Sequence, residues 1–261
     1  MLTRVRTALA AALLVSLSPG CSSMSRNEDP TATNRSPQEI SDLYTDLATS
    51  ALINDDLPRA IENLRTALKY NSDNAVAHNH LGLALIGMGK RDEARTEYER
   101  AISINPKYSD AMVNLGTWHF GKSDFITARH YYSKALDNLE YKSRYLPLTS
   151  LGHIDIVQGR REEARKHLYE ALAENPEYCL AHMLLGHLYD KDGRFDKARD
   201  EFKQSIKGVC AKNSEGQYQL GMVYMKLKDY GGARSQFTRI LESFPSTNMA
   251  DLAGERMKEI P

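Results

Sequence analysis

The side chains that could carry chemistry are few and scattered. The sequence contains three cysteines and eight histidines, the residue types that most often act as nucleophiles, general bases and metal ligands. His182 and His187 are close in sequence, but a spacing of five residues does not place two side chains on one helical face. Neither the Gly-x-Ser-x-Gly elbow of hydrolases nor the His-Glu-x-x-His motif of zinc proteases occurs. We therefore expect a protein that is not an enzyme, with no metal and no cofactor.

Phosphate and nucleic-acid chemistry are also disfavoured. The stretch Gly87-Met88-Gly89-Lys90 has a weak likeness to a phosphate-binding loop, but we interpret it as a turn between two helices. Lys and Arg together number 34, as do Asp and Glu, so the formal net charge is zero. A general nucleic-acid binder needs an excess of positive charge to displace counterions from phosphates. We expect neither a nucleic acid nor a small-molecule substrate as partner.

The first twenty residues have the pattern of an export signal. Arg4 and Arg6 precede an apolar stretch over residues 8–17, and small residues lead to Cys21. No apolar run reaches the length of about 20 residues that spans a bilayer. The segment resembles a bacterial lipoprotein signal, which implies cleavage before Cys21 and lipidation of its thiol; the alternative is a plain cleavage signal. Ser22, rather than Asp, follows the cysteine, which by the same resemblance implies the outer membrane.

Residues 21–37 contain almost nothing that a core could bury. Ser, Thr, Asn, Asp, Glu and Pro dominate this stretch, and such a composition is typical of a flexible tether. A tether of this length has a root-mean-square reach of about 20 Å. The folded part of the protein would therefore stay close to the membrane surface.

A repeated pattern of small and large residues occupies the sequence from about residue 41 to residue 247. Small residues recur every 34 to 36 positions, at Ala48, Gly82, Gly116, Gly152, Gly186 and Gly221. An alanine follows each of them twelve positions later, at Ala60, Ala94, Ala128, Ala164, Ala198 and Ala233. A large residue lies four positions further on, at Leu64, Tyr98, Tyr132, Leu168, Phe202 and Phe237. Small residues let two antiparallel helices approach closely, and the large residue on the same face fills the space beside them.

This pattern resembles the tetratricopeptide repeat, most clearly in the second unit with Gly82, Ala94, Tyr98 and the closing Pro106. The resemblance implies an all-α fold, a right-handed superhelical solenoid of six helix-turn-helix repeats with a C-terminal capping helix. The expected domain covers residues 38–261. Its repeats are expected at about 41–74, 75–108, 109–144, 145–178, 179–213 and 214–247, with the capping helix at 248–261.

The third and fourth units depart from the pattern. Glu140 stands where a closing proline is usual, so residues 137–144 should form a longer, polar turn. Asp155 occupies a position on the first helix of the fourth unit that is normally apolar. We expect that helix to be rotated so that Ile154 or Ile156 packs in its place.

Cys179 and Cys210 are the two cysteines that remain if Cys21 is lipidated. Cys179 lies at the expected start of the first helix of the fifth unit, and Cys210 just past the end of its second helix. These ends are neighbours in an antiparallel pair, and an oxidising periplasm permits a bond between them. The loop-entropy model assigns such a disulfide about 3 to 4 kcal/mol of stabilisation. The alternative is two independent buried thiols.

The first helices of a repeat stack are expected to line its concave face. In units one to three this face is mostly apolar, which favours a partner that covers it, such as an amphipathic helix. We predict partner binding mainly in this N-terminal half, through Thr49, Leu52, Val76, Asn79, Leu83, Ile86, Val113, Thr117 and Phe120. The alternative for any one of them is packing against the neighbouring repeat.

A lipoprotein signal, a short tether and six such repeats together resemble one family, the type IV pilus secretin pilotin lipoproteins of the PilF, PilW and Tgl group. The resemblance implies a lipid-anchored protein on the periplasmic face of the bacterial outer membrane. It implies binding of secretin subunits and promotion of their localisation and multimeric assembly. The alternatives are a repeat lipoprotein that serves as a scaffold for cell-wall hydrolases or synthases, or for an outer-membrane protein assembly machine.

Overall fold

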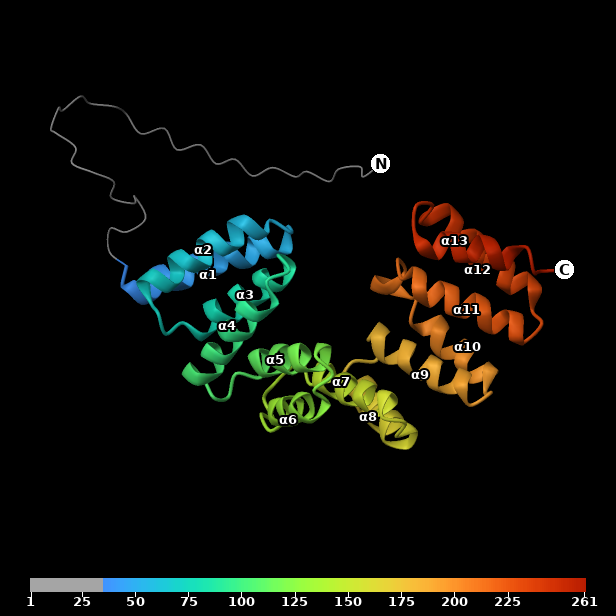
Figure 1. The fold of residues 1–261 in the computed structure, drawn as a ribbon, viewed down its shortest axis with the longest axis horizontal. Coiled ribbons are helices and arrows are strands. Elements are labelled where there is room, and N and C mark those ends of the chain that lie inside the picture. Colours follow the sequence, from blue (N-terminus) through green and yellow to red (C-terminus); the bar gives the residue numbers. More distant parts are fainter. Residues whose placement is uncertain (1–34) are drawn as a thin grey trace, which may run out of the picture. The chain divides into compact units, whose positions relative to one another are not determined.

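A computed structural model describes residues 35–261, and Ser36 to Pro261 form one compact unit (Figure 1). The expected signal peptide, Cys21 and most of the expected tether lie outside the described residues. Within the described part the secondary structure is entirely helical, which confirms the all-α repeat solenoid. The helices are α1 (Pro37–Ile53), α2 (Leu57–Tyr70), α3 (Ala75–Gly87), α4 (Arg91–Ile104), α5 (Ser109–Gly121), α6 (Phe125–Leu136), α7 (Tyr145–Val157), α8 (Arg161–Glu174), α9 (Cys179–Lys191), α10 (Phe195–Gln204), the short 3-10 helix η1 (Gly208–Cys210), α11 (Ser214–Lys226), α12 (Tyr230–Ser243) and α13 (Asn248–Met257).

Six helix pairs follow one another, from α1 with α2 to α11 with α12, and α13 packs on the last pair. Each odd-numbered helix from α1 to α11 makes its most extensive contacts with the helix that follows it, and each pair contacts the next (Figure 1). Within residues 35–261 no helix is both long and apolar enough to cross a membrane. The apolar residues are buried both within pairs and between neighbouring pairs, as in a repeat array.

The small residues of the repeat pattern lie where two helices of a pair meet. A β-carbon on Gly116 would lie 2.8 Å from the Tyr132 ring, and one on Gly186 would lie 2.7 Å from the Phe202 ring. Both aromatic rings are buried. The glycine on the first helix and the large residue on the second are thus complementary, and a larger residue at either glycine would push the pair apart.

The turn inside the second pair contains Gly89, which has a φ of +75° and is followed by α4. This is the left-handed region, which glycine enters without steric cost. Asp55, Ser123 and Lys228 adopt the same conformation in other pairs. The glycine-rich stretch at 87–90 is therefore the helix-to-helix turn that the sequence indicates.

The connection between α6 and α7 has a specific polar construction. Arg144 donates from Nη1 to the carbonyl oxygens of Leu136 at 2.9 Å and Asn138 at 3.3 Å. These contacts satisfy carbonyl groups that the end of α6 leaves without a helical partner. The turn is not wholly polar, because Tyr141 is buried and its hydroxyl donates to Asp110 at 2.8 Å.

The expectation that Ile154 or Ile156 packs in place of Asp155 is correct for Ile154 but wrong for Asp155, which stays in the core. Ile154 is buried, but Asp155 is buried as well, with 1% of its surface exposed. Its carboxylate lies 2.5 Å from Arg129, 2.7 Å from Arg160 and 2.7 Å from Nδ1 of His167. Burial alone would raise the pKa of Asp155, but these hydrogen bonds outweigh burial and hold its pKa below the usual range. A buried carboxylate is tolerated here because three partners surround it.

Candidate protein-binding groove

Two adjoining cavities form a groove along the first helices of the second to fifth pairs. The first cavity, of about 350 Å³, is lined by Leu83, Ile86, Arg91, Tyr98, Asn114, Thr117, Trp118, Phe120, Gly121 and Lys122. The second, of about 370 Å³, is lined by Val113, Asn114, Thr117, Phe120, Tyr132, Leu146, Ser150, His153, Tyr178 and Leu180. Three residues of α5, namely Asn114, Thr117 and Phe120, border both cavities, so we treat the two as one central groove.

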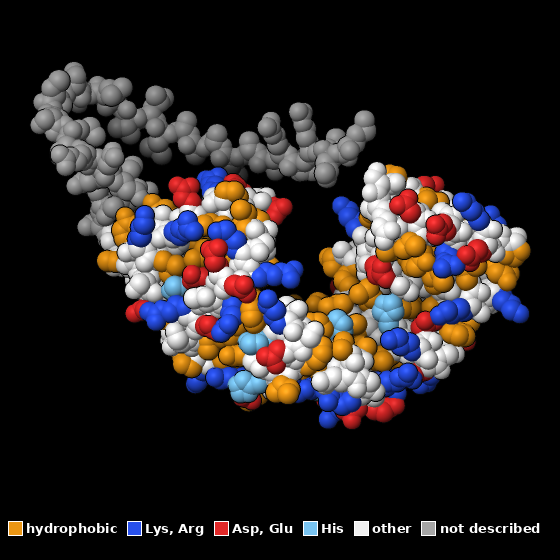
Figure 2. All heavy atoms as spheres, viewed as in Figure 1, with side chains coloured by type: hydrophobic (Ala, Val, Ile, Leu, Met, Phe, Trp, Pro, Cys, Tyr) orange, Lys and Arg blue, Asp and Glu red, His pale blue; other side chains and the backbone are white. Residues whose placement is uncertain are grey.

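Helical spacing explains why these residues share a surface. Leu83 and Ile86 are three positions apart on α3, as are Asn114 and Thr117 on α5, so each pair lies on one helical face. In the space-filling view of Figure 2, apolar side chains and pale-blue histidines gather over α7 and α9. The odd-numbered helices supply most of the groove, and the second helices contribute Tyr98, Tyr132 and Arg91, the first residue of α4.

Aromatic side chains hold the middle of the groove in place. The Phe120 ring lies 5.5 Å from Phe125 and 4.8 Å from His153, measured between ring centroids. Trp118 donates from Nε1 to the carbonyl oxygen of Arg91 at 2.9 Å. This hydrogen bond fixes the indole against the start of α4 and leaves its ring as a wall of the first cavity.

The charge of the groove differs between its two cavities. Arg91 and Lys122 line the first cavity, and no acidic side chain does. Within the described residues, the Arg91 guanidinium forms no salt bridge, and the Lys122 ammonium is 3.9 Å from Asp92, an exposed residue outside the lining. The second cavity is lined by neutral groups, because burial lowers the pKa of His153. One end of the groove is therefore cationic and the other is uncharged.

Several predicted binding residues lie on this groove. Leu83 and Ile86 are each 40% exposed and line the first cavity. Thr117 and Phe120 border both cavities, while Val113 is buried beneath the second. Large apolar side chains that remain this exposed in the middle of a concave surface indicate a surface that a partner covers.

Asn79 does not lie where the sequence placed it. It is 2% exposed, its Nδ2 donates to the Tyr108 hydroxyl at 3.3 Å, and its Oδ1 accepts from Asn114 at 2.9 Å. Its amide links α3 to α5 and is not free for a partner. Position within the repeat therefore did not distinguish a groove residue from one that joins neighbouring pairs.

Thr49, Leu52 and Val76 line neither cavity. The Thr49 hydroxyl lies 3.1 Å from Nδ1 of His80, and Leu52 packs against the core, while Val76 is exposed. The groove thus extends through α7 to α9, further toward the C-terminus than the expected location in units one to three.

Sequence reasoning missed the cationic end of the groove. Trp118 is the single tryptophan of the sequence and follows the predicted Thr117 directly. Arg91 and Lys122 lie at helix boundaries, where the repeat pattern prescribes no residue type. An isolated tryptophan beside a predicted groove position was a signal that could have identified this end.

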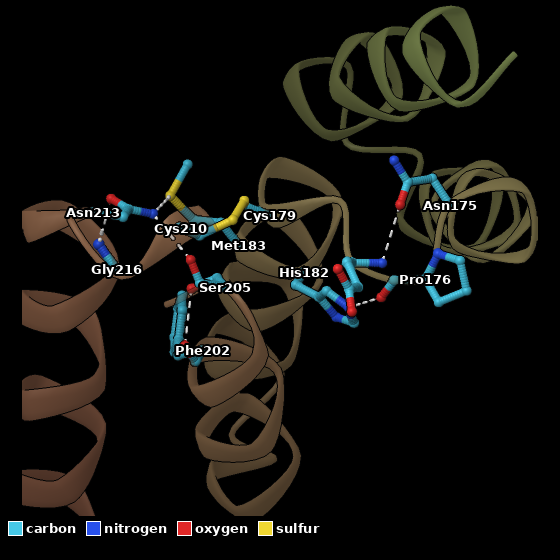
Figure 3. Close-up of a disulfide and its surroundings, with 11 residues drawn as sticks. Asn175, Pro176, Cys179, His182, Met183, Phe202, Ser205, Cys210, Asn213 and Gly216 are labelled. Carbon is cyan, nitrogen blue, oxygen red and sulfur yellow. Dashed lines mark hydrogen bonds between the residues drawn. A yellow bond between two sulfur atoms is a disulfide. The ribbon is translucent and has the colours of Figure 1, made fainter. Parts of the chain in front are cut away.

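The structure joins Cys179 and Cys210 by a disulfide (Figure 3). Their Cα atoms are 6.2 Å apart, within the range that a disulfide spans without backbone movement. The bond ties η1 to the first residue of α9. Nearby, Asn213 donates to the carbonyl oxygen of Ser205 at 3.4 Å and accepts from the Gly216 amide at 3.0 Å, which begins α11 (Figure 3).

Family models of the tetratricopeptide repeat match more than half of the chain. One model matches residues 51–117 and 156–207, and a second matches residues 215–247. A curated relative, a TPR repeat-containing protein of Methanocaldococcus jannaschii, is 26% identical over 201 residues, covering 70% of this chain and 35% of the relative. The human protein O-mannosyl-transferase TMTC3 is 23% identical over 199 residues, covering 71% of this chain and 22% of the relative. The chain thus spans about a third or less of the length of these two relatives.

Two solved structures match this chain over nearly their whole length. PilF of Pseudomonas aeruginosa has a TM-score of 0.71 and 18% identity, covering 84% of this chain and 99% of PilF. PilW, described as a widely conserved type IV pilus biogenesis factor, has a TM-score of 0.72 and 21% identity, covering 82% of this chain and 98% of PilW. At these identities the similarity shows a common fold.

Proposed function

This chain is a tetratricopeptide repeat protein, and from that premise we propose that it is a scaffold that binds type IV pilus secretin subunits and promotes their multimeric assembly. The observation that carries the proposal is the central groove, where Leu83 and Ile86 are each 40% exposed beside the half-buried Phe120. The near-complete match in length with PilF and PilW supports the choice of the pilus system. Scaffold function is also what the repeat-protein fold commonly provides.

The groove suits an amphipathic segment of the secretin. Apolar side chains of such a segment would displace water from Leu83 and Ile86, and each apolar Å² buried contributes about 25 cal/mol. The uncharged second cavity offers hydroxyl groups of Thr117 and Ser150 to polar positions of the segment. The secretin monomer would thus be held until it meets other monomers.

In this proposal a lipid on Cys21 anchors the protein to the periplasmic face of the outer membrane. A short tether with a root-mean-square reach of about 20 Å keeps the repeat domain close to the attachment point. Confinement to the membrane surface raises the effective concentration of bound secretin subunits, which favours their association. In this proposal the groove binds the secretin subunit, and the anchor promotes assembly by concentrating the bound subunits at the membrane.

Substitution of Leu83 or Ile86 by Asp tests the groove. Each change places a charge on an apolar surface that is already 40% exposed, so the fold should tolerate it while the bound segment should not. Heat-resistant secretin multimers should be lost, and the lipoprotein should remain at its normal level. Ile126→Asp is the matched control, because Ile126 is 85% exposed and lies outside the groove.

Persistence of multimers in both groove variants would show that the groove does not bind secretin. Affinity capture from solubilised envelope tests the partner itself, and secretin should be the dominant protein that the unmodified chain retains. Dominant recovery of cell-wall hydrolases, synthases or an outer-membrane assembly machine would contradict the proposal.

A further inference from the structure

We infer that the segment bound in the central groove carries a bulky apolar side chain close to an aspartate or glutamate, with its carboxylate at Arg91 and Lys122. The inference rests on one part of the proposed function, namely that the central groove is the protein-binding site. It does not depend on the partner being a secretin. It specifies the chemistry and the direction of the bound segment.

The first cavity provides the site for the apolar side chain. Leu83, Ile86 and Phe120 form its apolar lining, and the Trp118 indole forms a rigid wall, since its N–H is bonded to the Arg91 carbonyl. At about 350 Å³, the cavity has room for one large aliphatic or aromatic side chain and part of its backbone. Anchor side chains that fill such pockets dominate binding in protein interfaces.

The same cavity provides two positive charges that remain available. A third cation, Arg95, lies over the Trp118 ring, but its guanidinium already pairs with Glu99 at 2.8 Å. Glu93, the acidic residue two positions after Arg91, pairs with Lys90 at 3.1 Å. Arg91 has no salt bridge among the described residues. The Lys122 ammonium lies 5.3 Å from the centre of the Trp118 ring, and its one carboxylate partner among these residues is Asp92, at 3.9 Å. An incoming carboxylate can therefore pair with both cations, and a guanidinium can bind it through two hydrogen bonds.

The position of these charges gives the bound segment a direction. Arg91 and Lys122 lie at the end formed by α4 and α5, whereas the second cavity, which reaches α9, is lined by no Lys, Arg, Asp or Glu. A carboxylate of the bound segment therefore finds positively charged partners only at the end of the groove that contains the first cavity. A lysine or arginine of the segment at that end would face like charges, which excludes many otherwise apolar segments.

Selection from a random peptide library tests the inference without assuming a partner. The probe is a phage-displayed library of 12-residue peptides, selected on the purified full chain and on the double variant Arg91→Glu/Lys122→Glu. The unmodified chain should enrich peptides with Asp or Glu within four positions of Leu, Ile, Phe or Trp. The double variant should enrich Lys or Arg at those positions. Arg65→Glu is the control, because Arg65 is exposed on α2, away from the groove, and should select as the unmodified chain does.

Individual enriched peptides can be measured through Trp118, the only tryptophan of the sequence, when tryptophan-free peptides are chosen. Replacement of the acidic residue of such a peptide by its amide should weaken binding about tenfold, which corresponds to about 1.4 kcal/mol. Equal affinity of the two peptides would overturn the inference. Loss of binding on amidation of the peptide's C-terminus, with the side chain unchanged, would also overturn it, because the groove would then recognise a chain end.

The outcomes separate the inference from the proposed function. Enrichment of acidic, apolar peptides by a chain that retains no secretin from the envelope would refute the secretin partner and leave the inference standing. Retention of secretin together with the same peptide selection by the chain and its double variant would refute the inference alone.

Discussion

The carboxylate of Asp155 on α7 lies 2.5 Å from the guanidinium of Arg129 on α6, across the junction between the third and fourth helix pairs. Arg160 and His167 complete the set of partners from the fourth pair itself. The longer connection over residues 137–144 precedes α7 at this junction. The ion pair therefore crosses the one boundary where the repeat interval is 36 residues.

Replacement of Asp155 by Ala should lower the free energy of unfolding by about 2 kcal/mol. The loss is moderate for a buried ion pair, because Arg129 and Arg160 are partly exposed and can be solvated. Urea denaturation followed by circular dichroism measures it. Asp196→Ala, which removes an exposed ion pair with Arg199, should change stability little. Equal losses in the two variants would refute the structural role of Asp155.

His153 should make the protein less stable in mild acid. Burial lowers the pKa of His153 from its ordinary value of 6.5, so the unfolded chain binds a proton more readily than the folded chain. Stability is then fully present above about pH 6.5 and is lost as the pH falls toward the lowered pKa. His153→Gln should show a flatter decline as the pH falls below about 6.5. A decline as steep as that of the unmodified protein would assign the effect to other groups.

His182 should titrate in the opposite direction. Burial alone lowers its pKa. The ring nitrogens donate hydrogen bonds to the Glu201 carboxylate at 2.7 Å and to the Pro176 carbonyl at 2.9 Å, and these outweigh burial and raise the pKa above 6.5. Its contribution to stability is therefore present below about pH 6.5 and is lost as the pH rises through the raised pKa. Histidine resonances followed by NMR should give a higher midpoint for His182 than for His153. The reverse order would contradict both assignments.

Removal of the disulfide by Cys179→Ser and Cys210→Ser should lower the free energy of unfolding by about 3 to 4 kcal/mol. The effect arises chiefly because the bond restricts the unfolded chain over a sequence separation of 31 residues. Thiol counting in denaturant on the protein isolated from its own cells checks the bond directly. Two reactive thiols at these positions would show that the bond does not form in the cell.

Replacement of Cys21 by Ser should release the protein from the membrane fraction. The proposed lipid is attached to this thiol, and several acyl chains on one residue give a stable anchor. Metabolic labelling with a radioactive fatty acid should mark the unmodified protein and not the variant. Membrane association without label would show that another part of the chain provides the attachment.

The repeat pattern was sufficient to predict those parts of the fold that depend on the spacing of residues within one helix pair. Gly116 and Tyr132 could be matched from sequence, because the close approach within a pair requires a small residue at one position and a large residue sixteen positions later. The roles of Asp155 and Asn79 could not be derived in this way, since their partners Arg129 and Tyr108 belong to other helix pairs or connections. Contacts across a boundary depend on the offset between pairs, which the repeat itself does not encode.

The groove was predicted in part for the same reason. Leu83 and Ile86 follow from helical spacing on α3 alone. The cationic end formed by Arg91 and Lys122 depends on two turns from successive pairs lying beside each other. Turn residues carry no strong periodic signal, so only the structure brings them together.

The bond between Cys179 and Cys210 also affects how the chain withstands cleavage. It encloses the whole hairpin of α9 and α10, including the turn that contains Gly193. A protease that cuts in this turn would leave the two fragments covalently joined. Because the N-terminal fragment bears the proposed anchor at Cys21, the last helix pair would stay attached to the membrane after such a nick.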